Sequence, residues 1–99
     1  MIIVRAIIAK EKPEEFSCDL KDCTIIFYDY EKHTDIAWAD VTGPDIEKRI
    51  NVLRGWYQGF IRTMRYFNIE HEFIDLCFGD ENWKNGEHCK MLLEEELYG

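Results

Sequence analysis

Four cysteines are the residues best suited to chemistry in this chain of 99 residues. Cys18 and Cys23 are separated by four residues, a spacing at which two thiolates can chelate one zinc ion. Cys77 and Cys89 are twelve positions apart, however, whereas a strong zinc signature has two close pairs. Cys77 also lies in an apolar run, as a small core residue does. A metal-binding or redox domain using Cys18, Cys23, Cys77 and Cys89 stays open as an alternative to four ordinary reduced thiols and no cofactor.

The three histidines do not form a catalytic set with neighbouring residues. His71-Glu72 lacks the second histidine that a zinc-protease helix requires one turn later, and His33 falls in an expected turn. The chain contains no G-x-S-x-G elbow, no P-loop and no dinucleotide-binding glycine fingerprint. The sequence therefore favours binding over catalysis.

Carboxylates are the largest group of functional side chains, with 20 acidic against 12 basic residues and a net charge of -8. Such a field repels nucleic-acid phosphates and favours encounter with a basic protein. Carboxylates gathered on a small surface can imitate phosphates, with one exposed aromatic side chain as an anchor. The alternative is a solvated surface that only keeps the protein soluble. The expected contact residues are Glu11, Glu14, Glu15, Asp19, Asp22, Glu70, Glu72, Asp75, Asp80, Glu81 and Trp83.

Residues 42–67 reverse this charge, with two acidic and five basic side chains. Arg54, Arg62 and Arg65 would lie within about 80° of arc on a helix. They either pair with the domain's own acids, in surface salt bridges of about 0–1 kcal/mol each, or grip an acidic partner or a phosphate in a bidentate fork. Both interpretations remain open.

The elements that must position these side chains begin with three expected strands. Residues 2–9 are a β-branched run typical of a buried central strand, interrupted by Arg5. Residues 24–30 and 34–41 are rich in strand formers and are joined by a short polar loop, which predicts a hairpin. In the second of these strands, Ile36 and Trp38 are expected to point inward.

The strongest pattern predicts a long amphipathic helix over residues 44–67. Thr42 and Asp45 are spaced like a capping box, and Asn68 is a plausible stop. Gly55 and Gly59 lie outside the apolar stripe, where they mark either the close approach of another element or a tolerated weakness. The stripe, which spans an arc of about 120°, consists of Ile46, Ile50, Leu53, Tyr57, Phe60, Ile61, Met64 and Phe67.

The last third of the chain is less clearly patterned. Residues 69–78 fit a strand or a short helix equally well, residues 79–86 carry turn-forming types, and residues 87–98 show helical spacing. Together these elements predict one α+β domain over residues 1–99. Its sheet would have three or four mainly antiparallel strands, covered on one face by the helix over 44–67 and accompanied by a C-terminal helical element.

These observations predict a small non-enzymatic protein that inhibits or regulates a larger basic, nucleic-acid-handling protein without binding nucleic acid itself. Phage anti-defence proteins and immunity proteins share this profile, an analogy of composition alone. A cytoplasmic location without membrane association is expected, because no apolar run approaches the roughly 18–20 residues of a membrane span and no secretory pattern is present. A third interpretation is a homo-oligomeric structural subunit in which Val52 and Trp56 are buried between copies.

Overall fold

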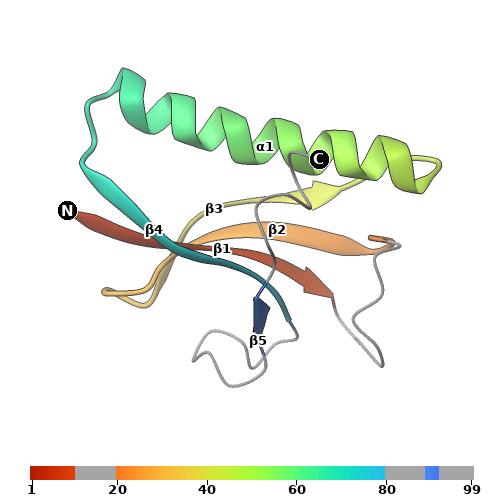
Figure 1. The fold of residues 1–99 in the computed structure, drawn as a ribbon, viewed down its shortest axis with the longest axis horizontal. Coiled ribbons are helices and arrows are strands. Elements are labelled where there is room, and N and C mark those ends of the chain that lie inside the picture. The colour runs from red at the N-terminus through yellow and green to blue at the C-terminus, as the bar shows by residue number, and fades with distance from the viewer. Residues whose placement is uncertain (11–19, 80–88, 92–99) are drawn as a thin grey trace.

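The computed structural model describes residues 1–10, 20–79 and 89–91. The strands form one sheet in the order β3-β2-β1-β4-β5, and α1 lies across one of its faces (Figure 1). The predicted α+β class and the central position of the first strand are confirmed. In chain order the elements are β1 (Ile2–Lys10), β2 (Cys23–Asp29), β3 (Thr34–Val41), α1 (Ile46–Tyr66), β4 (His71–Gly79) and β5 (Cys89–Met91).

The sheet is mixed: three of its four strand pairings are antiparallel, as expected, and one is parallel. β1 pairs antiparallel with β2 on one side and parallel with β4 on the other. The reason lies in the connection between β3 and β4. With 21 residues, α1 is about 30 Å long and returns the chain to the level where β3 began. β4 therefore runs in the same direction as β3, and hence parallel to β1.

The hairpin of β2 and β3 is confirmed, but the orientation of Trp38 is not. The register between the two strands shifts at Phe27/Tyr28, where Ile36 is an extra residue on β3. A bulge of this kind changes the phase of the in–out alternation. Ile36 therefore packs against the core, while after the bulge Ala39 and Val41 are buried and Trp38 is 66% exposed. The expectation that Trp38 faces inward is wrong for this reason.

The main core lies between α1 and the sheet. The helix contributes the buried side chains of Leu53, Tyr57 and Met64, as the apolar stripe predicts. Phe60, which is half-buried, stacks on the buried ring of Phe27 with a centroid separation of 4.0 Å. This packing fixes the helix over β1 and β2. Despite its length, the helix of the described part is too polar to cross a bilayer.

Both ends of α1 are set by local hydrogen bonds. Asp45 is the N-cap, because its carboxylate accepts the backbone N–H of Lys48 at 2.9 Å. The cap therefore lies three residues after Thr42, the start suggested by the capping-box spacing. The predicted stop is confirmed: Asn68 adopts a left-handed φ of 53°. Asn68 donates to the carbonyl of Arg65, and the next amide reaches back to Met64 in a Schellman motif.

The described residues of the C-terminal segment are not helical, although the sequence spacing over 87–98 predicts a helix. Residues 89–91 form the short strand β5, which pairs antiparallel with the end of β4. The ambiguous segment over 69–78 is also resolved as a strand, β4. Residues 92–98, on which the rest of the expected helical element falls, lie outside the described residues.

Candidate functional site

The acidic residues expected at the contact form two groups in the sequence, within 11–22 and 70–81, and the structure does not bring their described members together. Asp22 lies beside the end of β1, since the next residue, Cys23, pairs with Lys10. Glu72 pairs with Ile3, near the beginning of β1. The two ends are separated by seven residues of extended strand, or about 23 Å. Glu70 lies at the same end as Glu72, and the members that fall outside the described residues are Glu11, Glu14, Glu15, Asp19, Asp80, Glu81 and Trp83.

Asp75 is committed to an internal ion pair and does not extend the acidic surface. Its carboxylate accepts two hydrogen bonds from Arg5, from Nε at 2.8 Å and from Nη2 at 3.0 Å. Each side chain is only 10% exposed, and the guanidinium also lies over the Tyr30 ring, 4.7 Å from its centroid. This bidentate pair lies on the face of the sheet opposite α1 and joins the parallel strands β1 and β4.

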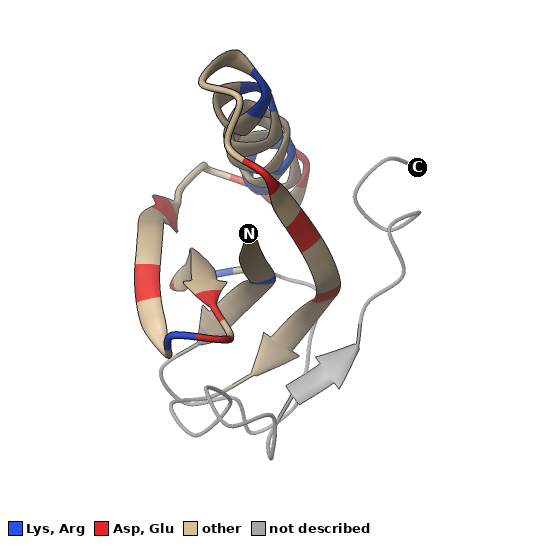
Figure 2. Cartoon of the chain, turned by 90° about the vertical axis from the view of Figure 1, so that its left-hand side faces the viewer, with Lys and Arg blue, Asp and Glu red and all other residues tan. Residues whose placement is uncertain are grey.

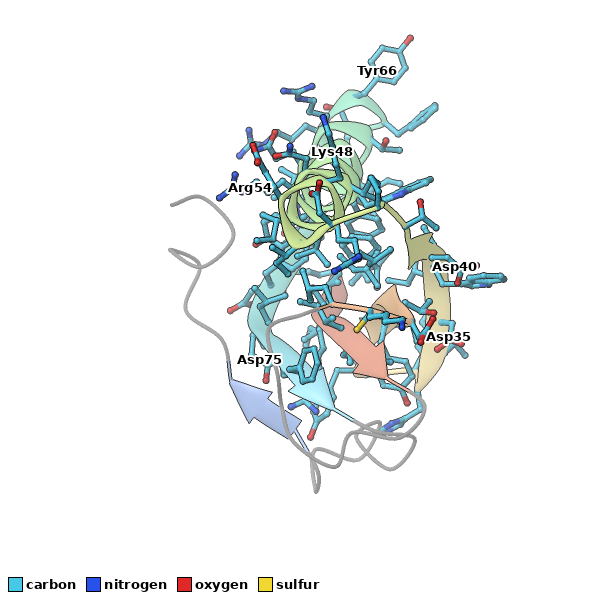
Figure 3. All side chains as sticks on the ribbon, turned by 90° about the vertical axis from the view of Figure 1, so that its right-hand side faces the viewer. Asp35, Asp40, Lys48, Arg54, Tyr66 and Asp75 are labelled. Carbon is cyan, nitrogen blue, oxygen red and sulfur yellow. The ribbon has the colours of Figure 1, made fainter. Side chains whose placement is uncertain are left out.

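The predicted arginine stripe lies on the flank of α1 that faces β4. Figure 3 shows Arg54 on this flank, on the far side of the helix from the β3 carboxylates Asp35 and Asp40. Arg54 interacts with other groups of the chain. Arg62 and Arg65 are exposed, and no described carboxylate forms a salt bridge with them. The stripe therefore does not line the groove described below.

The cysteines do not assemble a metal centre in the part of the chain that the structure describes. No cluster of three or more potential His, Cys, Asp or Glu ligands occurs there. Cys77 is fully buried and disulfide-bonded, and Cys23 is a buried thiol that donates to the carbonyl of Lys21. The expectation of four reduced thiols is thus wrong for Cys77. Cys18, and the side chain of Cys89, lie outside the described residues.

An apolar concavity of the described surface lies between α1 and the outer strand β3. It has a volume of about 700 Å³ and is lined mainly by apolar surface. Its floor is formed by Phe27, Phe60 and Met64. The walls come from three consecutive residues of β3 and from one side of α1: Ile36, Ala37 and Trp38 on β3, and Val52, Gly55, Trp56, Gly59 and Thr63 on α1.

Two tryptophans supply exposed aromatic surface at this groove, and two glycines leave open space in it. Trp56 is 50% exposed, and Trp38, at the outer edge of β3, is exposed still further. Gly55 and Gly59 are one helical turn apart, and a Cβ atom on either would meet nothing within 4 Å. Within the described residues, no other element approaches these two glycines, so they are not needed there for close packing. Their effect is to leave open space at two positions of the helical wall of the groove.

Carboxylates border the groove on the β3 side. Asp35 and Asp40 are exposed on β3, which carries no basic residue (Figure 2). Their partners in the register, Tyr28 and Thr24, lie on the face of the sheet opposite α1, and the Thr24 hydroxyl donates to Asp40 at 3.1 Å. The sheet edge therefore has an apolar side under α1 and an acidic side on the other face.

No known protein family, curated protein or solved structure matches this chain. The site is accordingly defined by its geometry and chemistry alone.

Sequence reasoning found part of this groove and missed the rest. Val52 and Trp56 were identifiable as an apolar margin of the helix, and Gly55 and Gly59 as helix-weakening residues that marked either the close approach of another element or a tolerated weakness. Trp38 was missed because the bulge that turns it outward depends on pairing with β2. The useful pattern was two glycines one turn apart beside an exposed aromatic residue.

Proposed function

We propose that this protein is a non-enzymatic binding domain that regulates or inhibits a basic protein, and that the α1–β3 groove is its contact surface. The observation that carries this proposal is the apolar groove flanked by two exposed tryptophans. Large exposed aromatic side chains are unusual on a small soluble domain and are enriched at the centres of protein interfaces. Here Trp56 stands on the helical wall of the concavity, and Trp38 lies at its β3 edge, with its register partner Ile26 on the face of the sheet away from α1.

The charge of the chain supports a basic partner. The net charge of -8 speeds encounter with a basic protein, and the carboxylates of Asp35 and Asp40 border the groove. The groove would supply most of the affinity by burying apolar surface, whereas the acidic edge would supply orientation and specificity. The contact surface thus moves from the acidic groups expected from the sequence to the β3 side of the domain.

A second copy of the chain fits this surface less well. Pairing β3 with its symmetry mate would bring the Asp35 and Asp40 carboxylates of both copies onto one face of the joined sheet. Like charges opposed across a strand pair are destabilising. The same surface is complementary to a basic segment.

The proposal can be tested by filling the groove. Gly59→Leu places a side chain into open space and improves helix propensity, so the fold should be retained. Gln58→Leu, on the neighbouring position outside the groove, is the matched control. Both variants and the wild type would be immobilised on a resin and incubated with nuclease-treated cell lysate at a series of salt concentrations. Circular dichroism would verify that each protein is folded.

The expected result is a basic protein, identified by mass spectrometry, that is retained by wild type and Gln58→Leu and lost from Gly59→Leu. Retention should also weaken as salt rises, because the encounter is electrostatic. Equal retention by all three proteins would place the contact surface elsewhere and overturn the proposal.

A further inference from the structure

The outer edge of β3 borders the groove along its length. β3 is the last strand of the sheet on this side, and its outer edge pairs with no strand of the described residues. An edge strand presents alternate backbone N–H and C=O groups to solvent, and these groups can template another strand. The bulge at Ile36 limits this stretch to the five residues Ala37–Val41, in which the register with β2 is regular.

From this arrangement we infer that the groove binds an extended peptide segment of the partner, added to the sheet as a new strand beside β3. The inference rests on the proposed function and specifies its ligand. Main-chain hydrogen bonds to Ala37–Val41 would hold the segment, and alternate side chains would enter the groove beneath Trp56, where Gly55 and Gly59 leave room.

The two faces of the edge determine the sequence pattern of that segment. Side chains on the α1 side enter a groove lined by apolar surface, so apolar residues fit there. Side chains on the opposite side lie beside Asp40 and Trp38, whose register partners Thr24 and Ile26 are on the face away from α1. Lysine or arginine fits that side, because it can pair with a carboxylate and stack on an indole. The ligand class is therefore an extended segment in which apolar and basic residues alternate.

A helical ligand satisfies fewer of these features. A helix would place its apolar stripe in the groove but would leave the backbone groups of the β3 edge exposed, since its own backbone bonds are internal. It would also repeat every three to four residues instead of matching the two-residue alternation of the β3 edge. The strand mode uses the groove, the edge and the carboxylates together.

The test uses the full-length chain and a capped eight-residue peptide of alternating valine and lysine. One control peptide has the same composition in two blocks, and another has glutamate in place of lysine. Binding would be measured by calorimetry, and amide hydrogen exchange by NMR. The expected result is binding of the alternating peptide only, with exchange slowed on the order of tenfold or more at alternate residues of Ala37–Val41.

Substitutions in the protein and the peptide sharpen the result. Asp40→Asn should weaken binding about twofold to fivefold, as expected for an exposed ion pair. Glu47→Gln, which also changes a carboxylate to an amide but lies on the Arg54 flank of α1, should leave binding unaltered. Methylating successive peptide amides should weaken binding at every second position, because only alternate N–H groups of an added strand face β3.

The outcomes separate this inference from the proposed function. Loss of the lysate partner from Gly59→Leu, together with peptide binding that leaves β3 exchange unchanged, would retain the function and overturn strand addition. Equal binding of the block peptide, or no binding of the alternating one, would also overturn it. A dimer in light scattering that Gly59→Leu dissociates would assign the groove to a second copy and overturn both.

Discussion

Arg5 and Asp75 face each other across the only parallel strand pair of the described sheet and form a bidentate ion pair with N–O distances of 2.8 and 3.0 Å. The pair is nearly buried on the side of the sheet away from α1, where Tyr30 covers the guanidinium. A buried charge of this kind is tolerated because its partner satisfies it.

Asp75→Ala is expected to destabilise the protein by about 3–5 kcal/mol, because it removes the carboxylate that pairs with the nearly buried Arg5 guanidinium. Replacing both residues, Arg5→Met with Asp75→Leu, should recover much of this loss, since no charge then remains in the apolar site. Urea denaturation followed by circular dichroism measures both free energies. A double variant as unstable as the single one would show that packing, not the charge, is responsible.

Gly59→Ala is expected to raise the free energy of unfolding by about 0.5–1 kcal/mol. The added methyl group meets open space, and alanine restricts the unfolded chain. Gly43→Ala is the contrasting variant. Gly43 has a φ of +151°, and its added Cβ would lie 2.9 Å from the Cβ of Lys48, so this substitution should be destabilising. Thermal melts of the two variants should therefore shift in opposite directions.

Asp45→Ala should cost about 1 kcal/mol, because it removes the acceptor for the Lys48 amide in the first turn of α1. Thr42→Ala is a direct control, since the capping-box spacing would make Thr42 the cap. Little change is expected at Thr42. Chemical denaturation of both variants distinguishes the two assignments: a larger effect at Thr42 would contradict Asp45 as the N-cap.

The cysteines should differ in alkylation. When the protein is denatured without reductant, Cys23 should react with iodoacetamide, whereas Cys77 should react only after a reductant is added. Peptide mass spectrometry reads out both sites and identifies the partner of Cys77. Reduction should also lower stability, typically by about 2–4 kcal/mol for a disulfide. Alkylation of Cys77 before reduction would contradict the bond.

The sequence was most informative where the pattern was local and long. The helix over 44–67 was predictable because its apolar stripe extends over six turns, and Asn68 marked its end through a conformation that asparagine tolerates. The hairpin of β2 and β3 followed from two strand-forming runs and a short polar loop. These features depend on neighbours in the chain.

The remaining features depend on pairing between distant segments. Nothing within residues 69–78 distinguishes a strand from a helix, and their strand state follows from pairing with β1. The buried state of Asp75 required knowing that it faces Arg5, seventy positions away. The outward turn of Trp38 required the bulge opposite Phe27/Tyr28. For the same reason, the acidic groups could be located in the sequence but not in space.

The two groove glycines have a practical consequence for anyone engineering this domain. A directed-evolution screen for heat tolerance alone would enrich larger residues at positions 55 and 59, since each glycine weakens the helix and the space beside it is open. In the more heat-tolerant proteins selected in this way, the larger side chains at positions 55 and 59 would fill the groove. Thermostability and recognition would thus trade against each other at these two positions, and a useful screen would have to select for both.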